Sequence, residues 1–320
     1  MIGYIEQAFK GYTDWWRYLL GFLFVFCIWQ LGASIQGGFV INELMNQGFD
    51  FNEAILKAAD YHVLMETLES NFNLFLLLLG FVFGFIAMWF TVKFFHNLKF
   101  NYFITSRPKI DWKRVFFGAG LIGAIIIVST LLEYWLNPNE FIINFQLEKF
   151  IILAIIGILM VPIQTTFEEL LFRGYFIQGL GSIFKSRAVA LIISSTLFGL
   201  LHIFNPEVGK LGYEALIVYI GTGFFFGIMT MMDEGMELAI GFHAANNLLT
   251  ALIVTSDWTA FDTYSIFRFV GEPSIIGIVY IPVFIIYPII LFILAKKYKW
   301  NNWKHRLFGK VIPPIFETQS

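Results

Sequence analysis

Two carboxylates and one guanidinium, those of Glu168, Glu169 and Arg173, lie within six residues of an otherwise apolar segment. An ionised side chain near the centre of a bilayer costs roughly 2.5–3.5 kcal/mol on insertion scales, so three together must serve one another or a reaction. Glu169 and Arg173 are four residues apart and share a helix face, which predicts an ion pair. Glu168 is turned about 100° away and is left free for acid–base work. The alternative is a purely structural cluster of buried charges.

Two further apolar segments carry histidines. Phe198 is followed four residues later by His202, and the helix is expected to stop just beyond, at Asn205-Pro206. His243 and Asn247 form another pair four residues apart, on one helix face. Asn246 is a possible substitute for Asn247, and spacing alone does not separate them. Each pair has a structural alternative, a hydrogen-bonded histidine or an interhelical hydrogen bond. Together with the acids, they suit water activation and stabilisation of an oxyanion.

The composition indicates the environment of these groups. Of the 320 residues, 58% are hydrophobic and only 14% are charged, against about 25% in an ordinary soluble domain. The net charge of −2 gives no indication of a nucleic-acid partner. The single cysteine, Cys27, excludes a disulfide or a paired-cysteine metal site. The predicted fold class is therefore all-α, a polytopic membrane protein whose surroundings are the lipid bilayer.

The apolar segments set the expected helix count. Because a bilayer core about 30 Å thick requires roughly 20 apolar residues per helix, we predict about eight transmembrane helices. They lie near residues 18–39, 72–95, 114–135, 150–174, 188–204, 213–232, 237–255 and 274–295.

The sequence divides into three parts around the motifs. Residues 1–149 hold the first membrane helices and an amphipathic outer segment, which is either an interfacial helix or an ordinary hairpin. Residues 150–255, predicted helices four to seven, form the catalytic core. Residues 256–320 hold the last membrane helix and a basic tail, which is expected to rest on lipid headgroups. Lysine and arginine residues concentrate on the segments that share a side with both termini, so both termini are predicted to be cytoplasmic.

The depth of the motifs leaves one question open. Glu168 and His202 each lie about 20 Å along a helix from the hairpin that joins their segments. His243, however, lies only six residues, or about 9 Å, after Glu237. Tilted helices, or a hairpin that extends into the cytoplasm, would bring the three side chains to one level.

The motifs resemble those of the CAAX-processing and bacteriocin-processing (CPBP, Abi-like) intramembrane proteases, which include the type II CAAX prenyl endopeptidases. That family's pattern is Glu-Glu-x-x-x-Arg, Phe-x-x-x-His and His-x-x-x-Asn. All positions match in order in this sequence: Glu168, Glu169, Arg173, Phe198, His202, His243 and Asn247. The resemblance covers roughly residues 150–255.

The resemblance implies a membrane-embedded endopeptidase that acts on a membrane-associated peptide or protein. Glu168 would be the general base that activates water, with His202 assisting, and His243 with Asn247 would stabilise the oxyanion. A metalloprotease interpretation of the family instead implies zinc, here held by Glu168, His202 and His243. We favour the mechanism without a metal cofactor, since an oxyanion hole gives Asn247 a role and zinc ligation does not.

Two other classes of function compete with proteolysis. One is a non-catalytic bacteriocin-immunity or scaffold protein that keeps the motifs for folding, although a scaffold needs no spare carboxylate at Glu168. The other is a proton-coupled transporter, because intramembrane glutamate and histidine also form proton relays. Transporters usually show paired repeats, and none is visible in the sequence. The residue usage hints at a bacterial inner membrane as the location.

Overall fold

A computed structural model describes residues 2–315 of the chain. Almost all of the regular structure is helical, as predicted. The α-helices are α1 Trp15–Asn46, α2 Phe51–Ala58, α3 Tyr61–Glu66, α4 Ser70–Phe90, α5 Phe100–Ile104, α6 Trp112–Leu136, α7 Leu147–Glu169, α8 Ile177–Phe184, α9 Arg187–Leu200, α10 Pro206–Leu211, α11 Ala215–Asp233, α12 Glu237–Ile253, α13 Tyr287–Tyr298 and α14 Trp303–Phe308.

Short segments of other types connect or extend these helices. The 3-10 turns are Ile5–Lys10, Pro138–Glu140 and Gly212–Glu214. The π-helical segments are Thr91–Phe95, Leu170–Phe176, Ile276–Tyr280 and Pro282–Ile286. The strands are β1 Phe141–Ile143, β2 Val254–Thr255 and β3 Phe267–Phe269, in the order β1-β3-β2. The pairing of β1 with β3 is antiparallel and that of β2 with β3 is parallel.

Six helical segments of the described residues are long and apolar enough to cross a membrane. They are Trp15–Asn46, Ser70–Phe95, Trp112–Leu136, Leu147–Phe184, Pro206–Asp233 and Ile276–Tyr298. The fifth and seventh predicted runs are also helical, but α9 has 14 residues and α12 has 17, fewer than the roughly 20 needed to span. The described residues thus form an all-α polytopic membrane fold, with six helical segments long enough to span and the shorter helices α9 and α12.

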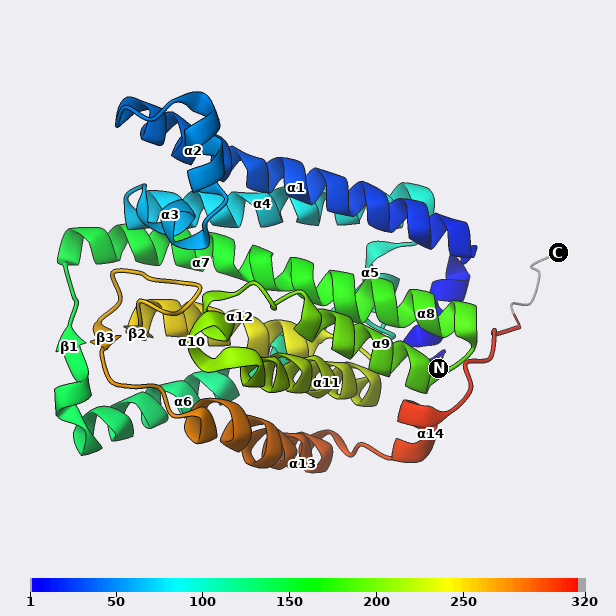
Figure 1. Cartoon of the computed structure of the whole chain (residues 1–320). Coiled ribbons are helices and arrows are strands. Elements are labelled where there is room, and N and C mark those ends of the chain that lie inside the picture. The colour runs from blue at the N-terminus through cyan, green and yellow to red at the C-terminus, as the bar shows by residue number, and fades with distance from the viewer. Residues whose placement is uncertain (1, 316–320) are drawn as a thin grey trace.

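The long helices lie side by side and run between two ends of the molecule (Figure 1). The N-terminus, α8 and α14 gather at one end, and α2, α3 and the three strands lie at the other. The outer segment forms two short helices, of which α2 packs Ala54 against Val40 and Leu44 of α1. Both α9 and α12 pack against longer helices, α9 on α11 and α12 on α6 and α7. Protein neighbours therefore replace much of the lipid around the two shorter helices.

Small residues allow the closest helix contacts. A Cβ atom added at Gly241 of α12 would overlap the Val115 carbonyl of α6, and one at Gly118 of α6 would press on the Leu238 carbonyl. Only glycine permits this approach of two backbones. Since Gly241 is two residues from His243, the packing of α6 on α12 fixes the position of that histidine relative to α6.

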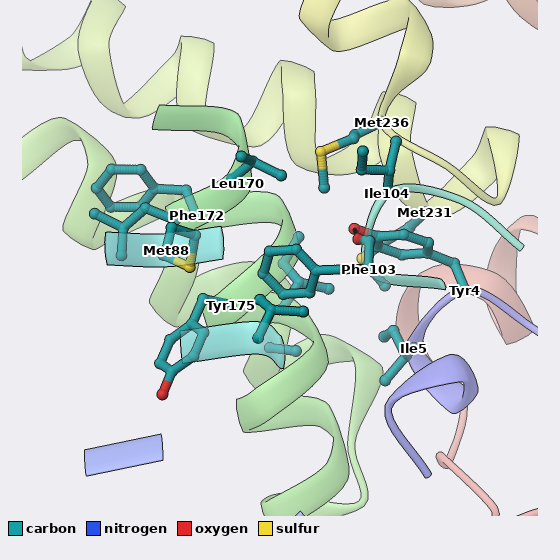
Figure 2. Close-up of a cluster of buried hydrophobic side chains, with 14 of the residues drawn as sticks. Tyr4, Ile5, Met88, Phe103, Ile104, Leu170, Phe172, Tyr175, Met231 and Met236 are labelled. Carbon is teal, nitrogen blue, oxygen red and sulfur yellow. Dashed lines mark hydrogen bonds between the residues drawn. The ribbon is translucent and has the colours of Figure 1, made fainter. Parts of the chain in front are cut away.

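The main apolar core surrounds the π-helical segment Leu170–Phe176. Figure 2 shows Phe172 and Tyr175 of this segment close to Met88 of α4, with Phe103 of α5 nearby. Tyr4, from the N-terminal segment, is fully buried in the same cluster. Its hydroxyl lies 3.0 Å from the carbonyl oxygens of Phe103 and Arg173 and can donate to either. The N-terminal residues are therefore part of the core that supports the charged motif.

The C-terminal tail packs on the protein. The Trp300 indole donates to Asp233 at 3.0 Å, Arg306 pairs with Glu234 at 3.0 Å, and Leu307 is buried. The tail is thus held by contacts within the protein, and its contact with lipid headgroups stays a prediction. Two carboxylates at the end of α11, the buried Asp233 and the partly buried Glu234, provide the hydrogen-bond and ion-pair partners of the tail.

Candidate active site

The buried ion pair predicted within the first motif is confirmed. Arg173 Nη1 lies 3.1 Å from Glu169 Oε1, and the two side chains are 1% and 0% exposed. The guanidinium also donates to the carbonyls of Thr222 and Gly223 on α11, at 3.4 and 3.3 Å. The central guanidinium carbon, Cζ of Arg173, lies 4.3 Å from the centre of the Phe198 ring. Arg173 thus joins α7, α9 and α11 at one point.

A π-helical segment begins directly after Glu169 and contains Arg173. A π-helical turn shifts the side chains that follow it and changes which backbone carbonyls are bonded, and such turns often occur at functional sites. The Ser194 hydroxyl of α9 donates to the Phe172 carbonyl at 2.7 Å. The Tyr4 hydroxyl lies at the Arg173 carbonyl. Neighbouring elements therefore hold this turn in place.

His243 lies between the two glutamates. Its Nδ1 is 2.8 Å from Glu169 Oε1, and its Nε2 is 3.5 Å from Glu168 Oε2. Because a carboxylate accepts, Nδ1 carries a hydrogen, and Nε2 faces Glu168. The sequence assigned Glu169 only to Arg173, whereas the structure gives the same oxygen to both Arg173 and His243. Glu169 therefore connects the first motif with the third.

The buried group holds two carboxylates and one guanidinium. Burial in a low-dielectric interior penalises uncompensated charge strongly, so the ion pair of Arg173 with Glu169 is needed there. Glu168 and His243 face each other at 3.5 Å, and a carboxylate and an imidazole are the side chains best suited to proton transfer.

Gln164, one turn before Glu168 on α7, is a site residue that the motif analysis missed. Its Nε2 donates to Glu168 Oε1 at 2.7 Å, and its Oε1 accepts from Asn247 Nδ2 at 3.3 Å. Asn246 donates in turn to Asn247 Oδ1 at 3.1 Å. The spacing of four between Gln164 and Glu168 was a signal available in the sequence. These contacts place Asn247, rather than Asn246, beside Gln164.

His202 lies next to the site but outside its helix. α9 ends at Leu200, so His202 occupies the turn that follows, and the prediction of a helical position was wrong. Its Nδ1 donates to the Phe198 carbonyl at 2.7 Å, and its ring stacks on Tyr219 of α11, with centroids 4.4 Å apart. Since Nδ1 carries the hydrogen, Nε2 of the neutral ring is an acceptor. Nothing in the sequence pointed to Tyr219.

The Phe198 ring contacts site residues from all three motifs. Its ring centroid is 4.8 Å from that of His202 and 6.2 Å from that of His243, in addition to its contact with Arg173. The three motifs therefore converge around one ring, although their predicted depths differed.

The length of one helix bears on the depth of the motifs. The segment Leu147–Phe184 is continuous over 38 residues, which corresponds to about 57 Å against a hydrocarbon core of about 30 Å. A helix of this length is longer than the hydrocarbon core is thick, so at least one of its ends lies outside that core. The start of α12 is also buried, with Glu237 fully enclosed and paired with Arg107 at 2.9 Å.

The residues of the zinc hypothesis do not form a ligand set in this arrangement. Within residues 2–315, no three His, Cys, Asp or Glu side chains gather closely enough to hold a metal ion. Glu168 uses one oxygen on Gln164, and His243 uses Nδ1 on Glu169. These contacts leave Glu168 Oε2 and His243 Nε2 uncommitted, but together with His202 the side chains do not gather closely enough for a metal site.

Fold and site together define an integral membrane protein with a buried acid–histidine centre. Residues 147–249 match the family model described as Type II CAAX prenyl endopeptidase Rce1-like. The matched residues include all three motifs, and the resemblance predicted from those motifs is confirmed. A Bacillus subtilis (strain 168) protein, "Uncharacterized protein YyaK", is 29% identical over 255 residues, which cover 78% of this chain and 81% of that protein. No solved structure matches the chain.

Proposed function

We propose that this protein is an intramembrane endopeptidase that hydrolyses a peptide bond of a membrane-associated peptide or protein. The observation that carries the proposal is the position of Glu168, whose Oε1 is held by Gln164 while Oε2 lies 3.5 Å from His243. A contact of 3.5 Å is longer than an ordinary charged hydrogen bond. Glu168 Oε2 therefore keeps lone pairs that can bind an attacking water.

In the proposed reaction, Glu168 takes a proton from water while the water oxygen attacks the substrate carbonyl carbon. His202 Nε2, an acceptor in the neutral ring, orients the same water. The electron pair of the carbonyl moves to its oxygen, and Asn247, with His243 when it is protonated, donates to that oxyanion. The C–N bond then breaks as the nitrogen receives the proton from Glu168. Products are a carboxylic acid and an amine.

The proposed setting is a bacterial inner membrane with both termini in the cytoplasm. Its support is the concentration of lysine and arginine on the segments that share a side with the N-terminus and α14. The substrate is either a prenylated CAAX peptide, as the family's description suggests, or a membrane peptide that is not prenylated. Cleavage assays with a farnesylated peptide and with membrane proteins distinguish the two substrate classes.

Proteolysis is tested with the wild type and with Glu168→Ala and His202→Ala, expressed to equal levels in the same membranes. We expect the wild type to cleave a fluorogenic farnesylated CAAX peptide or to change the terminal peptides of membrane proteins, measured by mass spectrometry. Both variants should lose the cleavage. Cleavage that persists in both variants, or is absent from the wild type in both assays, would overturn the proposal and favour a scaffold or transporter.

We further propose that the reaction needs no zinc. Its support is the spacing of the acid and histidine side chains, no three of which gather closely enough among residues 2–315 to hold a metal ion. Purified enzyme treated with a strong chelator, and checked for zinc by elemental analysis, is expected to keep its full rate. A loss of activity that added zinc restores would instead establish the metalloprotease interpretation.

A further inference from the structure

Three amide side chains and one carboxylate form a continuous hydrogen-bonded chain across α12 and α7. Asn246 donates to Asn247, Asn247 donates to Gln164, and Gln164 donates to Glu168, over distances of 3.1, 3.3 and 2.7 Å. Gln164 is 4% exposed and links the helix that carries Glu168 to the helix that carries Asn247. Glu169 and His243 also join these two helices, whereas Gln164 bridges Glu168 itself to Asn247.

The donor and acceptor roles along this series of hydrogen bonds follow from the carboxylate at one end. An ionised carboxylate only accepts, so the group of Gln164 that faces Glu168 must be its NH₂. The carbonyl oxygen of Gln164 is then left for Asn247, which must present its own NH₂ in turn. The Asn247 oxygen consequently points to Asn246. The ionised state of Glu168 thus dictates which atom of Asn247 faces the site.

We infer that Gln164 is a positioning residue that aligns the base Glu168 and the oxyanion donor Asn247 with each other. The inference rests on the proposed hydrolysis and deepens it. Gln164 holds Oε1 of Glu168 and thereby leaves Oε2 toward His243. It also holds the NH₂ group of Asn247 on the α7 side, beside the carboxylate that activates water. Gln164 therefore positions both Glu168, which activates the water, and Asn247, which donates to the oxyanion.

A side chain that acts only by filling space would behave differently. A Met in place of Gln164 has nearly the same volume but can neither donate to Glu168 nor accept from Asn247. A Glu in place of Gln164 keeps an oxygen that accepts from Asn247 but cannot donate to ionised Glu168. A hydrogen bond to a charged group contributes more than a neutral one. Interhelical hydrogen bonds within membranes contribute little to stability on average. Loss of the Gln164 contacts should therefore affect the rate more than the fold.

The test measures kcat, KM and thermal unfolding of Gln164→Met and Gln164→Glu on a substrate that the wild type cleaves. We expect kcat to fall about 10- to 100-fold in both variants, with KM within about twofold and an unfolding temperature close to that of the wild type. Gln178→Met is the matched control. Gln178 is equally buried farther along the same continuous helix, but it donates to backbone carbonyls of Tyr4, Tyr102 and Phe103. Its replacement should lower stability and leave kcat unchanged.

Two outcomes would overturn the inference. Wild-type kcat in Gln164→Met would remove any positioning role, and a rate loss that only accompanies unfolding would make Gln164 structural. Glu168→Ala, measured alongside, separates this failure from failure of the proposed function. If Glu168→Ala is inactive while Gln164→Met is fully active, only the role of Gln164 is wrong. If Glu168→Ala still cleaves, the proposed hydrolysis itself is wrong.

Discussion

Glu168→Gln is expected to lower kcat by about 10²- to 10⁴-fold while leaving the protein folded. The replacement has the same shape and keeps an oxygen that can accept from Gln164, the contact made at 2.7 Å. It cannot take a proton from water. Glu168 makes no contact with the Arg173 guanidinium comparable to the 3.1 Å pair of Glu169, so the buried ion pair stays intact. Substrate turnover and thermal unfolding in the same detergent measure the two effects.

The control for this prediction is Glu148→Gln, an isosteric change at the other end of α7. Glu148 is exposed, and its replacement should change neither the substrate turnover nor the thermal unfolding by a measurable amount. Turnover by Glu168→Gln within a few-fold of the wild type would show that another group activates water. A variant that loses both turnover and the unfolding transition would assign Glu168 to the fold instead. The variant should also retain bound substrate, which would make it a trap for identifying that substrate by mass spectrometry.

Arg173→Met is expected to lower the free energy of unfolding by about 3–5 kcal/mol, the cost of leaving one partner of a buried ion pair uncompensated. Glu169 is fully buried, and one of its oxygens, Oε2, already has no hydrogen-bond partner among the described residues. The Thr222 and Gly223 carbonyls would also lose their donor. Thermal or denaturant unfolding in detergent measures the loss, and turnover should fall with it.

A double replacement separates the structural role of the pair from its catalytic role. Exchanging both partners of a buried ion pair for apolar residues is often neutral for stability. Glu169→Leu combined with Arg173→Met should therefore recover most of the lost stability. It should remain inactive, because His243 Nδ1 loses the acceptor that lies 2.8 Å away. Recovery of activity together with stability would show that Glu169 serves only to neutralise Arg173.

The sequence by itself determined the class of fold and the set of residues that could react. Charged side chains are so costly in an apolar segment that Glu168, Glu169 and Arg173 stood out without any coordinates. The pairing of Glu169 with Arg173 also followed, because residues four apart meet on any helix. The eight helical runs followed from the length of each apolar stretch, although only six of them are long enough to span.

Only the tertiary structure decided how the motifs combine. Helical periodicity relates residues of one helix but carries no information about which helices touch. The sharing of Glu169 between Arg173 and His243, the stacking of His202 on Tyr219 and the bridge from Gln164 to Asn247 all join different helices. The π-helical turn after Glu169 likewise receives hydrogen bonds from other elements, since Tyr4 and Ser194 lie at the Arg173 and Phe172 carbonyls.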